Sequence, residues 1–358
     1  MNTENKQKCD YDIFIIGGGI NGCGVARDAA GRGYSVYLCE ADDLASGTSS
    51  QSTKLIHGGL RYLEHHEFRL VRVALTEREV LWNIAPHIIK PMRFILPHNK
   101  ALRSAWLLRL GLFLYDYIGG RKKLPTSRTL SLKNTPEGEC LRQDYTKGFE
   151  YSDCWVNDSR LVALNAISAA EYNAIIKTRH QCIGIERVNQ HWELTVQNKL
   201  TQQTEIVSAK VLINAAGPWV DTILGLLNPD HPAKNIRMVQ GSHIVVPKLY
   251  NHDKCYIFQN EDDRIIFAIP YHEHYTYLGT TDHEYSGDPR EVKITDEEIN
   301  YLCASANAYF KSNINKEDIV RTFAGVRSLY DDGASKAQEA TRDYVLRVDQ
   351  ENNNQAPL

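Results

Sequence analysis

The chain has 358 residues, 42% of them hydrophobic and 24% charged, which is long enough for two domains with ordinary cores. The 41 Lys and Arg nearly balance the 44 Asp and Glu, leaving a formal net charge of -3. This balance excludes a chain-wide basic field for nucleic acid, so an anionic partner has to be met by a few placed cations.

The spacing of the cysteines and the polarity of the N-terminal residues indicate a reducing compartment. The eight cysteines are scattered, and no two are spaced as in a metal clip or a redox pair. We therefore expect free thiols in a reducing compartment and no metal site. Residues 1–12 are polar, so no secretory signal is expected, and no apolar run approaches the roughly 20 residues that span a bilayer.

The first predicted unit is a strand, a glycine turn, a helix and a second strand. Residues 13–16 form an apolar run that stops at three glycines, and residues 20–30 are rich in the small residues of a closely packed helix. Residues 35–39 form the next apolar run, which ends at Glu40. The pattern predicts one βαβ unit of about 30 residues.

This unit has the spacing G-x-G-x-x-G at Gly17, Gly19 and Gly22. The first glycine permits a tight turn, the second lets the backbone approach a pyrophosphate, and the third lets the helix pack on the strand. The helix N-terminus favours phosphate charge, and Glu40 is placed to accept hydrogen bonds from an adenosine ribose. The unit therefore predicts a site for the ADP half of NAD or FAD.

Two features favour FAD over NAD. The unit lies at the extreme N-terminus and is followed by a long interrupted sequence. A later strand-like run, residues 211–215, ends in Ala216 and Gly217, as if a second strand also approached the dinucleotide. Residues 45–53 are almost all small and hydroxylated, which is typical of a loop that hydrogen-bonds a ligand.

Helices and strands follow along the chain. Residues 68–81 predict an amphipathic helix that ends near Pro86. Residues 101–118 are unusually apolar and have a basic border: Arg103, Arg109, Arg121, Lys122 and Lys123. This segment is interpreted either as a contact with an anionic membrane surface or as a core helix with a charged exit. Strands are predicted at 191–196, 205–215, 264–269 and 275–278, and a helix at 297–310.

Eight segments in one order resemble the FAD-dependent glycerol-3-phosphate dehydrogenase family, of the aerobic membrane-associated type. They are GGGINGCG, TSSQSTKLIHGGLRYLE, GFEYSDCWV, NAAGPWV, GSHIVVP, LGTTDHEY, FAGVRSL and TRDY. The resemblance runs from about residue 12 to the last residue. It implies an α/β flavoprotein of glycine/sarcosine-oxidase-like architecture, in which a Rossmann-like FAD-binding domain carries an inserted antiparallel-sheet substrate domain.

The resemblance also implies domain boundaries. The FAD-binding domain is expected to be discontinuous, at residues 1–95, 150–225 and 325–358, and the substrate domain at 96–149 and 226–324. The family continues into a glycine-rich GGKLTTYR segment and a helical domain, so we expect a chain that lacks the helical domain and a FAD-binding domain incomplete at its C-terminal end. The family usually has proline where Ser328 follows Arg327, and threonine is common where this chain has Ala-Ala before Gly217.

The reaction implied by the resemblance is oxidation of sn-glycerol 3-phosphate to dihydroxyacetone phosphate by hydride transfer to FAD. Quinone is the expected electron acceptor. We expect a peripheral protein on the cytoplasmic face of the inner membrane, otherwise in the cytoplasm, and consider a homodimer. Two alternatives stay open: a related FAD amine or amino-acid oxidase, and an inactive flavin-domain remnant.

The expected chemistry needs a base for the hydroxyl proton, and histidine titrates near working pH. His57 and His243 fall inside the matched segments, and both are candidates. A phosphate needs cations, which arginine supplies with a fixed fork. Arg61, Arg327 and Arg342 lie in the matched segments, with Tyr62 as a further donor and Thr281 and Asp282 as secondary candidates.

The residues expected to hold FAD come from four stretches of the sequence. They are Gly17, Gly18, Gly19, Ile20, Asn21, Gly22, Glu40, Thr48, Ser49, Ser50, Ser52, Lys54, His57, Ala216 and Gly217.

Overall fold

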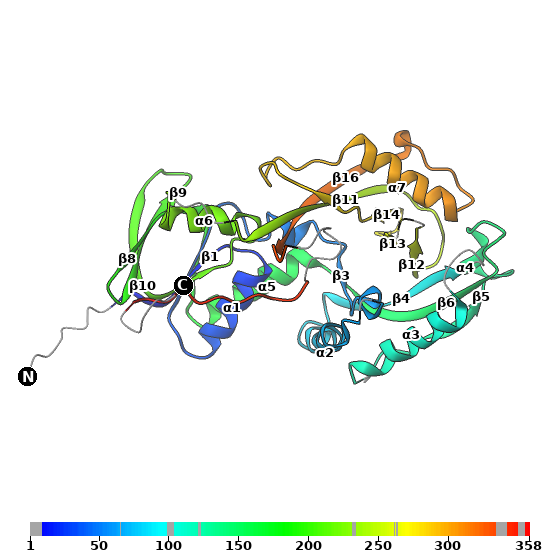
Figure 1. The fold of residues 1–358 in the computed structure, drawn as a ribbon, viewed down its shortest axis with the longest axis horizontal. Helices are drawn as coiled ribbons and strands as arrows, with labels where there is room; N and C mark the ends of the chain where they lie inside the picture. The colour runs from blue at the N-terminus through cyan, green and yellow to red at the C-terminus, as the bar shows by residue number, and fades with distance from the viewer. Residues whose placement is uncertain are drawn as a thin grey trace, which may run out of the picture.

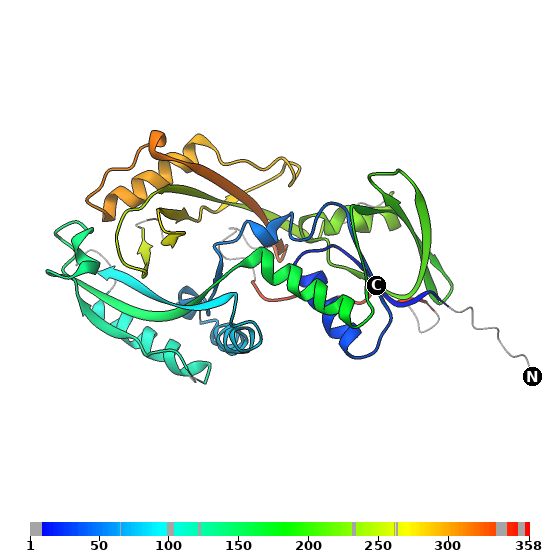
Figure 2. The ribbon, with the colours of Figure 1, turned by 180° about the vertical axis from the view of Figure 1, so that it is seen from behind.

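Two sheets divide the chain between two lobes along the long axis of the molecule (Figures 1 and 2). The computed structural model describes residues 9–64, 66–98, 104–120, 123–230, 234–260, 262, 264–333, 342–349 and 355–358. The basic residues Arg103, Arg121 and Lys122 that border the apolar segment lie outside the described residues.

The first sheet has six strands in the order β7-β2-β1-β10-β9-β8. In chain order they are β1 (Tyr11–Ile16), β2 (Val36–Glu40), β7 (Ile175–Thr178), β8 (His180–Val188), β9 (His191–Asn198) and β10 (Thr204–Asn214). β1 pairs in parallel with β2 and with β10. The helices of this lobe are α1 (Ile20–Gly31), α5 (Asp158–Glu171) and α6 (Val220–Leu227), with the short turn η3 (Gly217–Trp219).

Side chains of β1 alternate between two cores. Ile15 packs with the small residues of α1 and α5, whereas Phe14 and Ile16 pack with β8 and β9 on the other face. Because successive strand residues point to opposite faces, one apolar run supplies both cores. β1 is therefore buried on both sides, and its carboxyl end is held in a fixed place at the glycine turn.

The second sheet has β15-β11-β14-β13-β12-β4-β6-β3 in order, with β16 paired to β11 and β5 to β6. The strands are β3 (Leu55–Ile56), β4 (Ile89–His98), β5 (Arg128–Ser131), β6 (Lys147–Val156), β11 (Ile236–Pro247), β12 (Cys255–Gln259), β13 (Ile265–Tyr271), β14 (Tyr275–Gly279), β15 (His283–Glu284) and β16 (Arg321–Tyr330). The other elements of this lobe are η2 (Leu60–Leu63), α2 (Phe68–Ile84), α3 (Ala105–Ile118), α4 (Pro136–Glu139), α7 (Asp296–Tyr309) and η4 (Lys316–Asp318). The short turn η1 (Thr48–Ser50) contacts both lobes, through α5 and β16.

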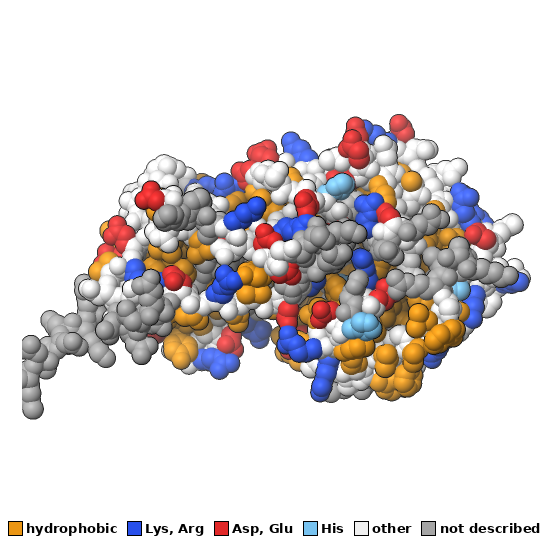
Figure 3. All heavy atoms as spheres, viewed as in Figure 1, with side chains coloured by type: hydrophobic (Ala, Val, Ile, Leu, Met, Phe, Trp, Pro, Cys, Tyr) orange, Lys and Arg blue, Asp and Glu red, His pale blue; other side chains and the backbone are white. Residues whose placement is uncertain are grey.

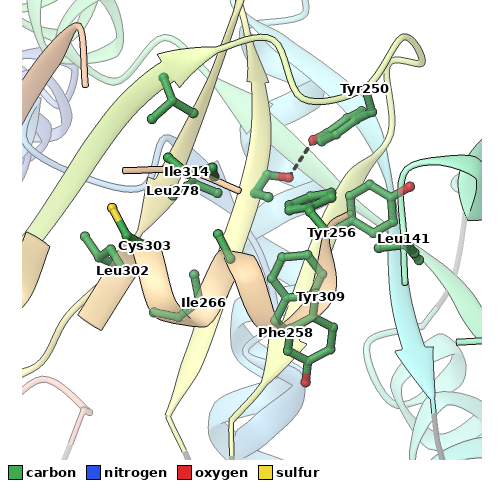
Figure 4. Packing of buried hydrophobic residues seen from close by; sticks show 14 of the residues in the cluster. Leu141, Tyr250, Tyr256, Phe258, Ile266, Leu278, Leu302, Cys303, Tyr309 and Ile314 are labelled. Carbon is green, nitrogen blue, oxygen red and sulfur yellow. Dashed lines mark hydrogen bonds between the residues drawn. The ribbon is translucent and has the colours of Figure 1, made fainter. Parts of the chain in front are cut away.

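Helices cover both faces of this second sheet. On β13, Ile266 and Ala268 face the core beneath α7, while Ile265 and Phe267 face the core beneath α2 and α3. Figure 4 shows the α7 side, where the Tyr250 hydroxyl donates a hydrogen bond to the Ala268 carbonyl at 2.8 Å. The sheet is therefore a rigid central layer that can position side chains at its edges.

The predicted helices and strands are present with small shifts at their ends. The helix predicted at 68–81 extends to Ile84, and the apolar segment is helical over Ala105–Ile118. Several elements were not predicted, among them α5, β4, β6, β8, β12 and β16. β6 is buried along most of its length, so its sequence lacks the alternation that marks a half-exposed strand.

The predicted domain boundaries do not follow the sheets everywhere. The boundaries at 95, 149 and 324 fall inside β4, β6 and β16, which all belong to the second sheet. β4 and β6 pair along the whole length of both strands, and β16 pairs along its whole length with β11. The division into a FAD-binding domain and a substrate domain stays a prediction.

Candidate active site

The turn between β1 and α1 is built from close backbone contacts. Gly17 has φ +112°, and a Cβ on it would lie 2.5 Å from the Ala215 carbonyl oxygen. A Cβ on Gly22 would lie 1.9 Å from the Gly17 carbonyl oxygen. The first and last glycines of the motif are therefore required for the tight turn and for the close packing of α1 on it.

Glu40, the last residue of β2, is oriented by the backbone around it. Its Oε2 accepts a hydrogen bond from Gly18 N at 2.6 Å, and its Oε1 accepts one from Asp42 N at 2.8 Å. An ionised carboxylate has about four lone-pair sites, so both oxygens retain capacity for a further donor. The carboxylate is held ready for hydroxyl donors such as those of a ribose.

A cavity of about 470 Å³ lies where β1, β2 and β10 end together. The carboxyl ends of parallel strands are the usual dinucleotide crevice of an open α/β sheet. The glycine turn leaves space that a Cβ would fill, and the N-terminus of α1 adds its positive dipole end. These residues fit the pyrophosphate of FAD. Ten of the predicted cofactor residues line the cavity: Gly17, Gly19, Ile20, Asn21, Glu40, Thr48, Ser49, Ser52, Ala216 and Gly217.

The hydroxyl-rich loop is anchored to three other elements. Ser49 Oγ accepts a hydrogen bond from Ile20 N at 3.0 Å, and Thr48 Oγ1 donates one to the Val326 carbonyl at 2.5 Å. Lys54 Nζ pairs with Asp158 at 2.8 Å, and Ser52 Oγ donates to the same carboxylate at 2.7 Å. The loop is thereby fixed between the two sheets. The other predicted cofactor residues, Gly18, Gly22, Ser50, Lys54 and His57, lie outside the cavity lining.

Three further residues at the cavity were missed from the sequence. The Arg290 guanidinium lies 5.5 Å from the ring centre of Trp219, and its Nε lies 3.9 Å from Asp42 Oδ2. All three line the cavity. Trp219 follows the recognised Ala-Gly-Pro turn, but Arg290 lies between β15 and α7, where no motif marks it.

Strand pairing brings the substrate-side candidates together. β11 lies between β14 and β16, with His243 opposite Gly279 on one side and Phe323 on the other. On β16, Arg327 Nη1 pairs with Asp282 Oδ1 at 3.0 Å, and its Nη2 donates to Thr280 Oγ1 at 2.9 Å. Candidate residues that are far apart in the sequence thus lie close together at one end of the second sheet.

Asp282 lies between two of the predicted phosphate-binding arginines. Its Oδ1 pairs with Arg327, and its Oδ2 lies 3.9 Å from Arg342 Nη2. The segment of Arg342 also reaches the glycine turn, since the Tyr344 hydroxyl donates to Asn21 Oδ1 at 3.1 Å. Two guanidinium groups therefore lie next to one carboxylate, and guanidinium groups suit an anionic substrate group.

His243 is enclosed in the second sheet. Its side chain is 1% exposed, its ring stacks on Phe323 with centres 4.5 Å apart, and its Nε2 lies 3.1 Å from Thr53 Oγ1. Burial, with the nearby charges of Arg327 and Lys54, lowers the pKa of His243 to about 3. The imidazole is therefore neutral at working pH.

His57 has different surroundings. It follows β3, is accessible to solvent, and meets the edge of Phe267 with ring centres 6.2 Å apart. The protein atoms around it desolvate the imidazole and lower its pKa, whereas the carboxylate of Asp153 acts in the opposite direction. An accessible imidazole with a carboxylate behind it can take up a proton more easily than His243.

The remaining substrate-side candidates are Arg61, Tyr62 and Thr281. Arg61 lines an apolar groove between η2 and α3. Tyr62, also on η2, packs against the core beneath α2 and α3. Burial lowers the pKa of Arg327, and the carboxylate of Asp282 acts in the opposite direction. The hydroxyl of Thr281 is buried and donates to Glu298 Oε1 at 2.5 Å, so it is the Thr281 carbonyl that meets Arg327, at 3.3 Å.

Known proteins share this architecture and much of the sequence. Residues 12–348 match the family model described as FAD dependent oxidoreductase. The chain is 54% identical over 339 residues to D-erythritol 1-phosphate dehydrogenase of Brucella abortus, covering 95% of this chain and 68% of the relative. It is 53% identical over 350 residues to glycerol-3-phosphate dehydrogenase of Pseudomonas tolaasii, covering 97% of this chain and 67% of the relative. The chain thus spans about two thirds of these relatives.

Two solved structures extend the comparison. The glycerol-3-phosphate dehydrogenase of Bacillus halodurans complexed with FAD superposes with a TM-score of 0.72 at 31% identity, over 89% of this chain and 57% of that chain. Glycine oxidase of Bacillus cereus superposes with a TM-score of 0.64 at 19% identity, over 90% of this chain and 84% of that chain, and indicates the fold alone. The predicted architecture and the predicted FAD cofactor are confirmed.

Proposed function

The chain belongs to the FAD-dependent glycerol-3-phosphate dehydrogenase family, and we propose that it oxidises a phosphorylated polyol, sn-glycerol 3-phosphate, to dihydroxyacetone phosphate. The observation that carries the proposal is the Arg327–Asp282–Arg342 cluster beside the FAD cavity. FAD, when bound, supplies the acceptor for the hydride that leaves the alcohol carbon. The protein residues bind the phosphate and remove the hydroxyl proton.

Arg327 and Arg342 are the proposed phosphate ligands. Arg327 is fixed by three acceptors, the Asp282 carboxylate, the Thr281 carbonyl and the Thr280 hydroxyl. A guanidinium fixed in this way offers a preset fork to a phosphate. Tyr62 and Arg61, on η2, are proposed to supply further donors when the substrate is bound.

His57 is the proposed base. A base has to be neutral before the reaction and has to be stable as a cation after it. His243 meets the first requirement only, because Arg327 and Lys54 oppose a second positive charge beside them. His57 is accessible and has Asp153 to offset the charge. His243 is proposed instead to orient Thr53, its hydrogen-bond partner.

Two polyol phosphates are candidate substrates. The two relatives of near-equal identity are named for D-erythritol 1-phosphate and for glycerol 3-phosphate. Both compounds carry a phosphate ester and a secondary alcohol, so the same arginines and base suit both. We favour glycerol 3-phosphate because the matched segments are those of that family.

Purified holoprotein tests the proposal. The visible spectrum is recorded first, because a chain that stays colourless after addition of FAD would support the inactive-remnant alternative. Both polyol phosphates are then oxidised with a soluble quinone analogue, and kcat/KM and the product are measured. Formation of dihydroxyacetone phosphate with the higher kcat/KM supports the proposal. Hydrogen peroxide and ammonia from an amine substrate, without polyol-phosphate turnover, would show an oxidase instead.

A membrane contact through α3 is proposed as the route to quinone. Trp106, Leu110 and Phe113 are 70%, 47% and 50% exposed. Hydrophobic side chains gather on the surface where α3 lies (Figure 3). None of the helices among the described residues is long and apolar enough to span a bilayer. The exposed face of α3 therefore suits peripheral binding at a headgroup layer, proposed here as that of the inner membrane on its cytoplasmic side.

Vesicle cosedimentation tests this contact. Trp106→Ser should reduce binding to vesicles containing anionic lipid about fivefold or more, because an interfacial aromatic side chain is lost. Leu200→Ser is the matched control, since Leu200 is also 70% exposed but lies in the turn between β9 and β10 of the other lobe. Equal binding by both variants and the unchanged protein would contradict the α3 contact.

A further inference from the structure

A buried polar cluster lies beneath the turn that carries His57. Its members are Arg78 and Glu79 of α2, Tyr115 of α3 and Asp153 of β6, and all four are buried. Ionised groups are rarely this buried without a reason, because removing them from water is costly. None of the four belongs to the cofactor or phosphate sites described above.

Tyr115 connects the cluster to the His57 turn. Its hydroxyl accepts a hydrogen bond from Gly58 N at 2.6 Å. The same hydroxyl donates to the carboxylate of Asp153, with oxygen–oxygen distances of 2.8 and 2.9 Å. On the far side, Arg78 Nη1 donates to Asp153 Oδ1 at 2.6 Å. A continuous chain of hydrogen bonds thus runs from α2 through Asp153 to the residue after His57.

The His57 turn lies directly against the helices that carry this cluster. A Cβ on Gly58 would lie 2.4 Å from Leu75 Cδ2 of α2 and 2.8 Å from the Tyr115 hydroxyl. No larger residue fits there without displacing α2 or α3. The position of the His57 backbone is therefore set by these two helices, with Tyr115 as the polar contact.

The charges of the cluster do not balance. It contains two carboxylates and one guanidinium, and Glu79 Oε1 lies 3.3 Å from Arg78 Nη2. Burial raises the pKa of Asp153, while Arg78, His57 and Tyr115 lower it. The other titratable groups that face Asp153 are neutral at working pH: Tyr151 and Cys154 of β6 and Cys255 of β12. Of these charges, Asp153 favours the protonated form of the accessible His57 imidazole, and Arg78 opposes it more weakly.

We infer that Asp153, held by Arg78 and Tyr115, is a positioning residue that fixes the His57 turn and stabilises the protonated imidazole formed when His57 accepts the substrate hydroxyl proton. The proton moves from the alcohol oxygen to His57, and Asp153 keeps its charge throughout. This inference rests on the proposed role of His57 as the base. It assigns Tyr115 a function on the inner face of α3, opposite the exposed apolar face.

Chemical modification measures the imidazole without any turnover. Diethyl pyrocarbonate reacts with neutral imidazole, so the rate of His57 modification against pH, followed by peptide mass spectrometry on the FAD-bound protein, reports its pKa. Asp153→Asn removes the opposing negative charge and should move the half-maximal rate down by about 0.5 to 1 pH unit. The acid limb of kcat/KM should move with it. An unchanged profile in a folded, flavin-containing Asp153→Asn protein would overturn the inference.

If the Asp153→Asn protein does not fold, Tyr115→Phe is tested instead. The Tyr115→Phe protein keeps the Arg78–Asp153 ion pair. The substitution removes the hydroxyl that donates to Asp153 and accepts from Gly58 N, so kcat should fall about tenfold at unchanged FAD content. Tyr151→Phe is the matched control, because Tyr151 packs edge-on against the Tyr115 ring, with centres 5.8 Å apart, in the same core. Equal kcat in the two variants would also overturn the inference.

The proposed function can fail separately. If the unchanged protein oxidises no polyol phosphate, the modification profiles still decide whether Asp153 controls His57. If it does oxidise glycerol 3-phosphate while Asp153→Asn leaves the modification profile unchanged, only this inference is lost.

Discussion

The two sheets build their sites in different ways. At the first sheet, the dinucleotide cavity is shaped by backbone: the Gly17–Gly22 turn, the end of β2 and the end of β10. At the second sheet, the substrate side is shaped by side chains from separate segments, such as Arg327 of β16 and Asp282 between β14 and β15, which are 45 residues apart in sequence. The dinucleotide cavity needs glycines, which have no side-chain atoms, at the turn. The substrate side needs charged side chains at fixed positions.

This difference predicts different kinds of failure. An added methyl group in the glycine turn displaces backbone atoms that have no freedom to move, so cofactor and fold are lost together. Removal of a charged side chain from the second sheet leaves the strands paired, so flavin is retained and a single kinetic constant changes. Substitutions on the two sides can therefore be sorted by whether flavin content changes.

Gly22→Ala should have the largest effect. The new Cβ would lie 1.9 Å from the Gly17 carbonyl oxygen, so α1 has to move away from the turn. We expect flavin content, measured as the ratio of absorbance at the flavin band to that of the protein, to fall at least tenfold. Gly24→Ala is the control on the same helix, because no atom lies within 4 Å of its added Cβ. It should retain flavin and stabilise the helix by about 0.5 to 1 kcal/mol.

His57→Asn should have the next largest effect, on the side-chain-built site. Loss of the proposed base should lower kcat for glycerol 3-phosphate by about 10² to 10⁴ while flavin content stays unchanged. His274→Asn is the control, since the His274 side chain is 81% exposed on the second lobe. A similar fall in kcat for His243→Asn, with His57→Asn near normal, would transfer the base role to His243.

Arg327→Ala should act on KM instead. Loss of one charge-assisted contact to phosphate costs about 1.5 to 3 kcal/mol, so the KM for glycerol 3-phosphate should rise about tenfold to a hundredfold. Arg321→Ala, an exposed arginine at the other end of β16, is the control and should leave KM unchanged. Parallel loss of flavin in Arg327→Ala would show that Arg327 supports the cofactor site, and the contrast between the two sheets would be weaker.

The same contrast explains what could be predicted from the sequence. The glycine turn and Glu40 are local in the chain, so spacing alone predicted the unit and its site. Arg327 and His243 were predicted only through resemblance, because their meeting depends on the register of β11 with β14 and β16. Asp153, Tyr115 and Arg290 were missed, since each acquires its place through contacts with distant segments that no local pattern records.

His243 gives the smallest predicted effect, through the pH dependence of stability. Its ordinary pKa of 6.5 falls to about 3 in the folded protein. Below pH 6.5 the unfolded chain binds a proton that the folded protein excludes, so stability decreases as the pH falls from 6.5 toward 3. Between pH 7 and 5.5 this linkage costs about 1 kcal/mol, or about 1 to 2 °C in the unfolding midpoint.

His243→Asn removes this titration and should make the unfolding midpoint less sensitive to pH in that window, whatever its absolute stability. The comparison is between the pH 7 and pH 5.5 midpoints of each protein, measured by flavin fluorescence on heating. His274→Asn should retain the unchanged protein's full decrease, because its side chain is 81% exposed and the buried His243 is still present. An equal decrease in all three proteins would show that His243 takes up a proton in the folded state. In that case Arg327 and Lys54 would not keep it neutral, and the argument that prefers His57 as the base would lose its electrostatic support.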